Sequence, residues 1–168
     1  YTKGEELAIR YNEEIARYLK KYIPGFENAY FDRVAPFMGI RETRRLVGEY
    51  ILTEQDIFDC AKFDDSIAVS AYPVDQHHPV GGDCTLMWCP DCHDIPYRSL
   101  LPKKIDSLIV AGRCISATHL ALASVRVMGP AMATGEAAGK AAALSVKYNV
   151  QLRDLDVAAL QTALREEG

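Results

Sequence analysis

The chain has 168 residues, 49% of them hydrophobic and 25% charged, and its formal net charge at pH 7 is −4. This length and composition are typical of a soluble globular domain with its own core, which excludes a disordered tail. Charges of both signs are mixed along the chain, so it lacks the basic stripe that binds nucleic acid or anionic membranes. No apolar run reaches the roughly 18 residues of a membrane span. We therefore expect neither nucleic acid nor a membrane as a partner.

The first expected element is an amphipathic helix over residues 4–22, where apolar side chains recur with the helical period between charged ones. A proline-glycine pair at 24–25 ends it. Residues 29–53 are rich in β-branched and aromatic side chains but are interrupted by proline and glycine, which predicts two strands separated by bends. Thr53 is then a suitable N-cap for a short helix over 54–62 with acidic residues in its first turn.

The middle of the chain reads as short strands around a long loop. Residues 66–72 alternate like a strand. Residues 73–93 show no periodicity and predict a long loop, of the kind that more often carries function than not. The segments "IPYRSLLP" (95–102) and "DSLIVAG" (106–112) are expected to be strands, the second apolar enough to be buried on both faces.

The C-terminal part predicts an alanine-rich helix over 129–148, with Pro130 at its first position, and a last helix over 154–166. The backbone N–H groups at the start of the first of these helices would suit an anionic or electron-rich ligand atom. Its small residues permit either tight packing or the close approach of a flat ligand. These small residues, which form a stripe along the helix, are Ala131, Gly135, Gly139 and Ala143. The N–H groups at the helix start are those of Met128, Gly129 and Ala131.

Three motifs resemble one known family. "LIVAGRCIS" followed by "ASVRVMGPAMATGEAAG" is similar to the C-terminal, flavin-contacting segment of FAD-dependent oxidoreductases, in the branch that includes the flavin subunit of heterodisulfide-reductase-like proteins. "GIRETRRLVGEYILTEQDI" and "DIPYRSLLPKKID" resemble the same branch, so the likeness covers residues 31–143. Three separated motifs in the same order are more specific than a single glycine-rich match.

The resemblance implies an α+β flavoprotein fold. Residues 1–103 would form a substrate-capping mixed sheet with helices, and residues 104–168 the final strand and helix of a Rossmann-like FAD-binding domain. The chain starts at Tyr1 without methionine and lacks the G-x-G-x-x-G turn that binds the ADP pyrophosphate. We therefore expect a C-terminal portion of a longer enzyme that would not retain FAD or activity unaided.

The same resemblance implies a set of flavin contacts. The strand ending at Gly112 would pass under the flavin, and Arg113 would lie near its pyrophosphate or ribityl chain. The helix start would face the N1/C2=O edge of the ring and stabilise the negative charge of reduced flavin. The implied cofactor-binding residues are Ala111, Gly112, Arg113, Ser116, Ser124, Val127, Met128, Gly129 and Ala131.

Four residues are candidates for the chemistry, which would be hydride transfer between FAD and an unidentified small substrate. The resemblance places His119 and Arg126 beside the ring, and an imidazole titrates in the range needed to exchange a proton. Arg41 or Arg44 would bind a substrate carboxylate bidentately, or these arginines would pair with acids on a wet surface. An electron-transfer partner protein is a further expectation. Tyr97 and Arg98 are equally suited to a structural and to a flavin-side role.

The spacing of Cys89, Cys92 and His93 is the C-x-x-C-H order of covalent haem attachment. With Cys84 these side chains would complete a tetrahedral zinc shell. Alternatively, Cys89 and Cys92 would form a redox pair, or the cysteines would simply lie in a loop without a special role. An iron–sulfur cluster is less favoured because only three cysteines lie close in sequence. The alternative to a flavoenzyme is thus a non-enzymatic metal-binding or interaction module centred on residues 84–93. The odd number of cysteines, five in all, favours a reducing, cytoplasmic setting.

Overall fold

A computed structural model describes residues 2–77 and 84–167. The chain divides into two compact units, Tyr1–Ile40 and Arg41–Gly168. The division expected at residue 103 stays a prediction. No helix of the described residues is both long enough and apolar enough to cross a membrane.

The first unit consists of helix α1 (Thr2–Tyr22) and an irregular segment that follows it. The helix confirms the amphipathic pattern, because apolar side chains recur along it and Tyr18 packs against Tyr22 with ring centroids 4.9 Å apart. Gly25 ends it as predicted, with a positive φ of 94° that other residues rarely adopt. Residues 23–40 form neither helix nor strand, so the first of the two strands predicted within 29–53 is wrong.

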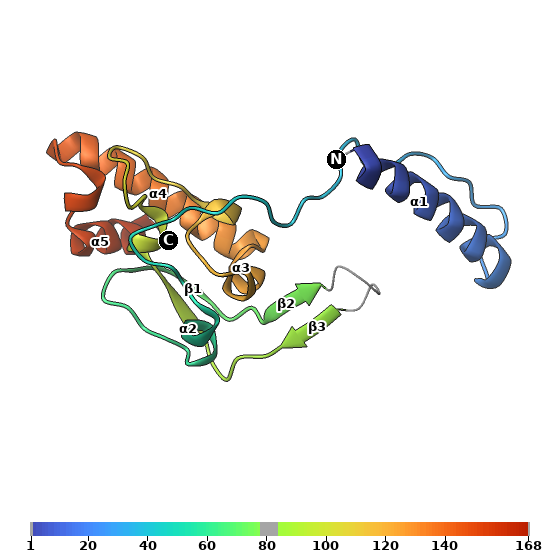
Figure 1. Cartoon of the computed structure of the whole chain (residues 1–168), viewed down its shortest axis with the longest axis horizontal. Coiled ribbons are helices and arrows are strands. Elements are labelled where there is room, and N and C mark those ends of the chain that lie inside the picture. The colour runs from blue at the N-terminus through green and yellow to red at the C-terminus, as the bar shows by residue number, and fades with distance from the viewer. Residues whose placement is uncertain (1, 78–83, 168) are drawn as a thin grey trace. The chain divides into compact units, whose positions relative to one another are not determined.

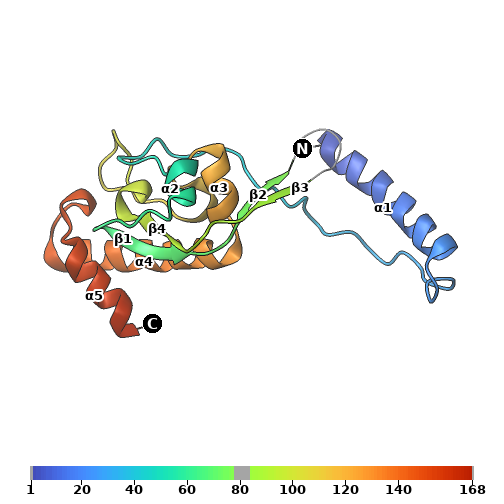
Figure 2. The same ribbon diagram turned by 90° about the horizontal axis from the view of Figure 1, so that it is seen from below.

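The second unit is built on a small antiparallel sheet of β1 (Ser66–Ser70) and β4 (His93–Pro96). Helix α4 (Met128–Tyr148) lies along one side of this sheet, and the short helices α2 (Glu54–Phe58) and α3 (His119–Val125) lie on the other (Figure 2). Mixed helices and small sheets agree with the expected α+β class. The Rossmann-like arrangement stays a prediction.

The helical predictions of this unit are confirmed, with shifted ends. Thr53 caps α2 in a capping box with Asp56, but the helix ends at Phe58 rather than near residue 62. Helix α4 begins at Met128, and the last helix, α5 (Val157–Glu167), follows a 3-10 helix over Leu152–Asp154 and packs on α4 (Figure 1).

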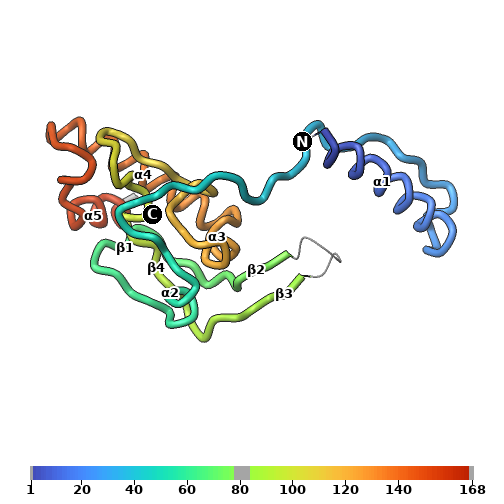
Figure 3. Tube along the Cα trace, in the orientation of Figure 1, coloured from blue at the N-terminus to red at the C-terminus, as the bar shows by residue number. Residues whose placement is uncertain are grey.

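Residues 73–93, predicted as a loop, contain an antiparallel hairpin of β2 (Val74–His77) and β3 (Cys84–Met87) (Figure 3). Each strand has four residues, and polar side chains occur on both strands, so no alternation is visible in the sequence. The residues that join the two strands lie outside the described part of the chain.

Three other predicted strands are wrong. Residues 46–52 form only isolated bridges, Gly48 with Pro102 and Leu52 with Ala117. The "IPYRSLLP" segment leaves β4 at Pro96 and turns into a 3-10 helix over Tyr97–Leu100. The apolar 106–112 segment pairs with no strand of the described chain. It bends at residues 106–107, where Ser107 has a positive φ of 56°, and its backbone bond to another segment runs from the Val110 N–H to the Leu100 carbonyl, at 3.0 Å. Residues 106–108 are exposed and 109–112 half-buried, so the prediction of a strand buried on both faces is wrong, and apolar content alone did not distinguish such a strand from an irregular segment.

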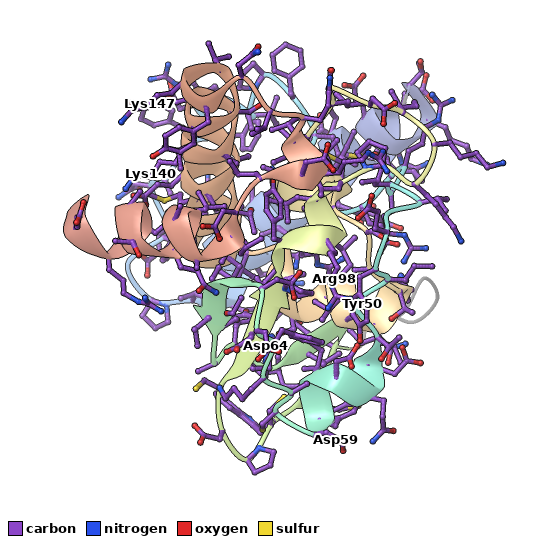
Figure 4. The ribbon with its side chains drawn as sticks, turned by 90° about the vertical axis from the view of Figure 1, so that its left-hand side faces the viewer. Tyr50, Asp59, Asp64, Arg98, Lys140 and Lys147 are labelled. Carbon is purple, nitrogen blue, oxygen red and sulfur yellow. The ribbon has the colours of Figure 1, made fainter. Side chains whose placement is uncertain are left out.

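The structural role of Tyr97 and Arg98 is now visible. The Tyr97 ring is buried in the core and its hydroxyl donates to the Leu152 carbonyl at 2.9 Å. Arg98 donates to both carboxylate oxygens of Asp65, at 2.9 and 3.1 Å, and covers the Tyr50 ring, to which it is adjacent in Figure 4. Tyr97 thus joins segments of the core, and the half-exposed Arg98 joins its segment to Asp65 and Tyr50, which favours the structural role over the flavin-side one.

Gly48 provides a stability prediction, because a side chain there has no space. An added Cβ would lie 2.6 Å from the Cβ of Ser116 and 3.1 Å from the Leu101 carbonyl oxygen. We expect Gly48→Ala to lower the free energy of unfolding by about 1–3 kcal/mol through overpacking. Urea denaturation measures the change.

Gly139→Ala is the matched control, because an added Cβ at this helical glycine meets nothing within 4 Å. It should raise stability by about 0.5–1 kcal/mol, since alanine loses less entropy than glycine in a helix. Equal effects of the two substitutions would contradict the close contact at Gly48.

Candidate functional site

The first turn of α4 presents unpaired backbone donors. The N–H groups of Met128 and Gly129 have no partner within the described ranges, and Pro130, which is the third residue of the helix rather than its first, has no N–H. Ala131 differs from the prediction, because its N–H donates to the Val127 carbonyl at 3.0 Å. The positive end of the helix dipole is therefore available through two N–H groups, not three.

A groove of about 640 Å³ adjoins this helix start. Its walls come from the end of β1 and the segment after it, from β3 and the residue that follows it, and from the first turn of α4. The lining is mostly apolar and includes Val69, Tyr72, Leu86, Trp88, Val127, Met128, Gly129 and Pro130. A groove with an apolar wall and unpaired backbone donors at one end suits a flat, largely apolar ligand with an electron-rich edge.

The segment around Gly112 lies against the same helix turn. Gly112 has a positive φ of 70°, and its N–H donates to the Thr134 hydroxyl at 3.0 Å. An added Cβ would come within 3.9 Å of Ala131. Ala111 and Gly112 are half-buried, whereas Arg113 is exposed. The predicted "AGR" segment and the predicted helix start are therefore neighbours.

The small-residue stripe of α4 does not pack within the described chain. Gly135 and Gly139 have open space where a Cβ would stand, and Ala143 is exposed. The buried face of the helix consists of Pro130, Thr134, Ala137, Ala138 and Ala141. Gly135, Gly139 and Ala143 therefore do not pack tightly on the sheet within the described residues, and the approach of another group to them is left open.

Ser116 and Ser124 are buried and occupied by structural hydrogen bonds. The Ser116 hydroxyl accepts from the Gly48 N–H at 3.0 Å, and the Ser124 hydroxyl donates to the Tyr72 carbonyl at 2.6 Å. Tyr72 lines the groove, so Ser124 holds one of its walls. These serines position the site through main-chain contacts, and a direct flavin contact from them stays a prediction.

Glu42 brings together two of the predicted catalytic residues. Its carboxylate lies 2.7 Å from Nδ1 of His119 and 3.9 Å from the Arg126 guanidinium. It also faces Arg45 at 3.4 Å, whose Nη1 is buried without a well-formed hydrogen bond. Sequence reasoning treated Glu42 only as a surface partner of the arginines. The signal that could have identified it is a lone acid inside the run "RETRR".

Asp75 is the centre of a second polar cluster, which contains the predicted catalytic residue Arg41. The buried Asp75 carboxylate accepts from the Cys84 thiol at 2.9 Å and from Arg41 at 3.3 Å, and it lies 3.1 Å from Nε2 of His77. The thiol bond, with smaller effects from His77 and Arg41, holds the pKa of Asp75 below its usual range. The same bond raises the pKa of the Cys84 thiol.

Arg126 connects the two clusters. Its side chain is 8% exposed, it faces Glu42, and its guanidinium donates to the Asp75 carbonyl at 2.8 Å. Arg44, by contrast, is exposed and forms no hydrogen bond or ion pair with any residue that the structure describes. Three of the four predicted catalytic residues therefore share one network, and Arg44 does not.

The four-ligand set predicted from the cysteine loop is not assembled. Among the described residues, Asp75, His77 and Cys84 are the group whose ligand atoms converge, so Cys84 is separated from its predicted partners. The Cys92 thiol accepts from Lys62 at 3.3 Å, and His93 is fully buried. Cys89 is partly buried, and burial raises the pKa of its thiol, which does not favour a reactive thiolate there.

Comparison with known proteins supports the resemblance. The family model for FAD dependent oxidoreductases matches residues 1–164, almost the whole chain. The chain therefore belongs to the family of FAD-dependent oxidoreductases. Neither the curated proteins nor the solved structures contain a match.

The Glu42 carboxylate provides a prediction about stability. Glu42→Gln keeps the shape of the side chain but leaves the largely buried guanidinium of Arg126 and that of Arg45 facing a neutral amide. We expect the free energy of unfolding to fall by about 1–3 kcal/mol in urea denaturation. Glu136→Gln removes an i,i+4 pair with Lys140 in which Glu136 is half exposed and Lys140 keeps its bond to the Ala163 carbonyl, so it should cost less than about 0.5 kcal/mol. A Glu42→Gln effect no larger than this control would contradict the central role of the carboxylate.

His93 provides a prediction about pH. Burial, with a smaller effect from the Lys62 charge, lowers its pKa below the ordinary 6.5. The unfolded chain therefore takes up a proton at this histidine near pH 6.5 while the folded chain resists it, so stability is retained above that pH and lost below it.

We expect the urea midpoint to fall between about pH 7.5 and 5.5, and to fall less in His93→Gln, which does not titrate. Carboxylates with lowered pKa values, such as Asp65 and Asp75, lose their contribution only at more acidic pH. Identical pH dependence in the parent and His93→Gln would show that the buried imidazole is not the cause.

Proposed function

We propose that this chain carries the ring-binding and substrate-facing half of a flavin-dependent oxidoreductase. The observation that carries the proposal is the apolar groove that ends on the unpaired N–H groups of Met128 and Gly129. A flavin ring is flat, largely apolar and electron-rich at one edge, so it matches both parts of this surface.

The residues fit the ring but not the whole dinucleotide. Trp88 and Tyr72 offer aromatic and apolar surface to a ring, and the α4 start offers donors to its carbonyl edge. No G-x-G-x-x-G turn occurs in the sequence, so the motif that would hold the pyrophosphate is not present in this chain. The stripe of Gly135, Gly139 and Ala143 is open to a further group, consistent with contact to another part of a complete FAD site.

When bound, the flavin would supply acceptance and donation of a hydride. The α4 N-terminus would stabilise negative charge at the edge of the ring. His119 is oriented by Glu42 through Nδ1, which leaves Nε2 to exchange a proton with substrate. Arg126 precedes Val127 in the wall of the groove, and its contacts with Glu42 and the Asp75 carbonyl fix that wall.

The substrate class we propose is a small carboxylate. Arg44 is the best anchor, because a guanidinium that has no partner among the described residues can bind a carboxylate bidentately. Arg41 is committed to Asp75 and would have to leave it first. The heterodisulfide-reductase-like branch, an electron-transfer partner protein and a cytoplasmic setting, which five free thiols favour, belong to the same proposal.

Trp88 offers a direct test, because it is the sole tryptophan of the sequence and lines the groove. Titration of the purified chain with riboflavin should quench its fluorescence saturably. FAD should bind no more than a few fold more tightly than riboflavin, since the motif for its pyrophosphate is missing. Absence of saturable quenching by either flavin would contradict the proposal.

Two leucine substitutions separate the groove from the rest of the helix. Gly129→Leu places a side chain at the groove, and Gly139→Leu places one on the same helix away from it; neither meets an atom within 4 Å at its Cβ. We expect riboflavin binding to weaken at least tenfold in Gly129→Leu and to change little in Gly139→Leu. A larger loss of riboflavin binding in Gly139→Leu than in Gly129→Leu would indicate that the ring binds at the stripe and not in the groove.

A further inference from the structure

We propose that Asp75, His77 and Cys84 form a binding site for a divalent transition-metal ion of the zinc class on the β2–β3 hairpin. The site does not depend on the proposed flavin chemistry. It also differs from the Cys84, Cys89, Cys92 and His93 set that the sequence indicated.

The hairpin places the three ligands by its own geometry. Asp75 and His77 are two residues apart on β2, and side chains alternate along a strand, so both point to the same face. His77 is paired directly with Cys84 on β3, which places the thiol beside the imidazole. The carboxylate, imidazole and thiol therefore converge because of strand register, not through a chance meeting of flexible loops.

The distances between ligand atoms fit one ion. The Asp75 carboxylate lies 2.9 Å from the Cys84 sulfur and 3.1 Å from Nε2 of His77, and that nitrogen lies 4.0 Å from the sulfur. Zinc binds O, N and S ligands at about 2.0–2.3 Å in tetrahedral geometry, which separates the ligand atoms by a little over 3 Å. Small side-chain rotations suffice, and water can take the fourth position.

A cation already occupies the centre of the cluster. The Arg41 guanidinium lies 2.7 Å from Nε2 of His77 and 3.3 Å from the Asp75 carboxylate. An arginine N–H can only donate, so Nε2 faces it with its lone pair, as a metal ligand must. Arg41 is 58% exposed and is held by this cluster, so a metal ion can displace it.

The charges balance when a metal ion replaces the Arg41 guanidinium. The Cys84 S–H loses its proton to the solvent as the sulfur–metal bond forms, and the Asp75 carboxylate and neutral His77 bind through existing lone pairs. One thiolate and one carboxylate neutralise a divalent ion, and the mixed O, N and S donor set favours zinc or cobalt over magnesium or calcium. No oxidant or reductant is needed.

Cobalt(II) alone, titrated into the whole chain without flavin, tests the site. We expect a saturable thiolate-to-cobalt charge-transfer absorption that added zinc abolishes by competition. Cys84→Ser should lose the band, whereas Cys92→Ser should keep it. Cys84 is exposed, so the substitution leaves the core unchanged, and a urea denaturation curve matching that of the parent confirms the fold.

Arg41→Gln tests the competing cation. We expect its cobalt affinity to rise severalfold, because the ion no longer has to displace a guanidinium. No charge-transfer band, a band retained by Cys84→Ser, or an Arg41→Gln affinity no higher than that of the parent would each overturn the proposal. Because riboflavin quenching of Trp88 is measured without metal, failure of the metal site and failure of the flavin groove are distinguishable.

Discussion

The contacts of Arg126 are the constraint on which the second unit's polar face depends. Its guanidinium is almost fully buried, and a buried charge is tolerated only with partners. Those partners come from distant parts of the chain: Glu42 from the segment after residue 40, and the Asp75 carbonyl from β2. The Arg126 guanidinium therefore joins the β2–β3 hairpin, the segment that contains Glu42, and the junction of α3 with α4.

The same junction decides where α4 begins. Arg126 is the C-cap of α3 and Val127 the N-cap of α4, so the chain has no residue between the two helices with a side chain that could cap the second one. The apolar side chain of Val127 cannot accept a hydrogen bond from the first turn of α4, whereas the Thr118 side chain accepts one from the Ala121 N–H of α3. The unpaired N–H groups at the start of α4 are consequently left to solvent or to a ligand. The length of α4, 21 residues, is not what leaves its start uncapped.

Much of the helical structure could be predicted from the sequence, because long periodic patterns and caps are local signals. The α1 and α4 helices and the Thr53 cap are examples. The strand predicted at 66–72 is confirmed by β1, but which segments pair could not be predicted, because pairing is long-range: β1 pairs with β4, whereas residues 46–52 bond to several segments without forming a ladder. A short apolar run does not specify whether a partner strand exists.

The candidate site shows the same limit. The predicted residues His119 and Arg41 are found in polar clusters, but the acids that organise them lie 77 and 34 residues away in sequence. The resemblance to flavoenzymes identified the family, and the local sequence pattern predicted the α4 helix, because both depend on contiguous residues. It did not identify Glu42 or Asp75 as organising residues, because charge compensation in a fold is decided by which segments pack together.

This compensation also explains what kind of charge the groove favours. Glu42 faces Arg126 and Arg45, and Asp75 binds Arg41, so the cations near the groove wall are already paired. The groove itself is lined by apolar side chains and by the α4 start, whose positive character is a fractional charge from backbone dipoles. Such a surface offers no formal positive charge of its own. It therefore suits a negative charge spread over a flat apolar group better than the compact charge of a pyrophosphate, as the proposed binding of a reduced flavin ring requires.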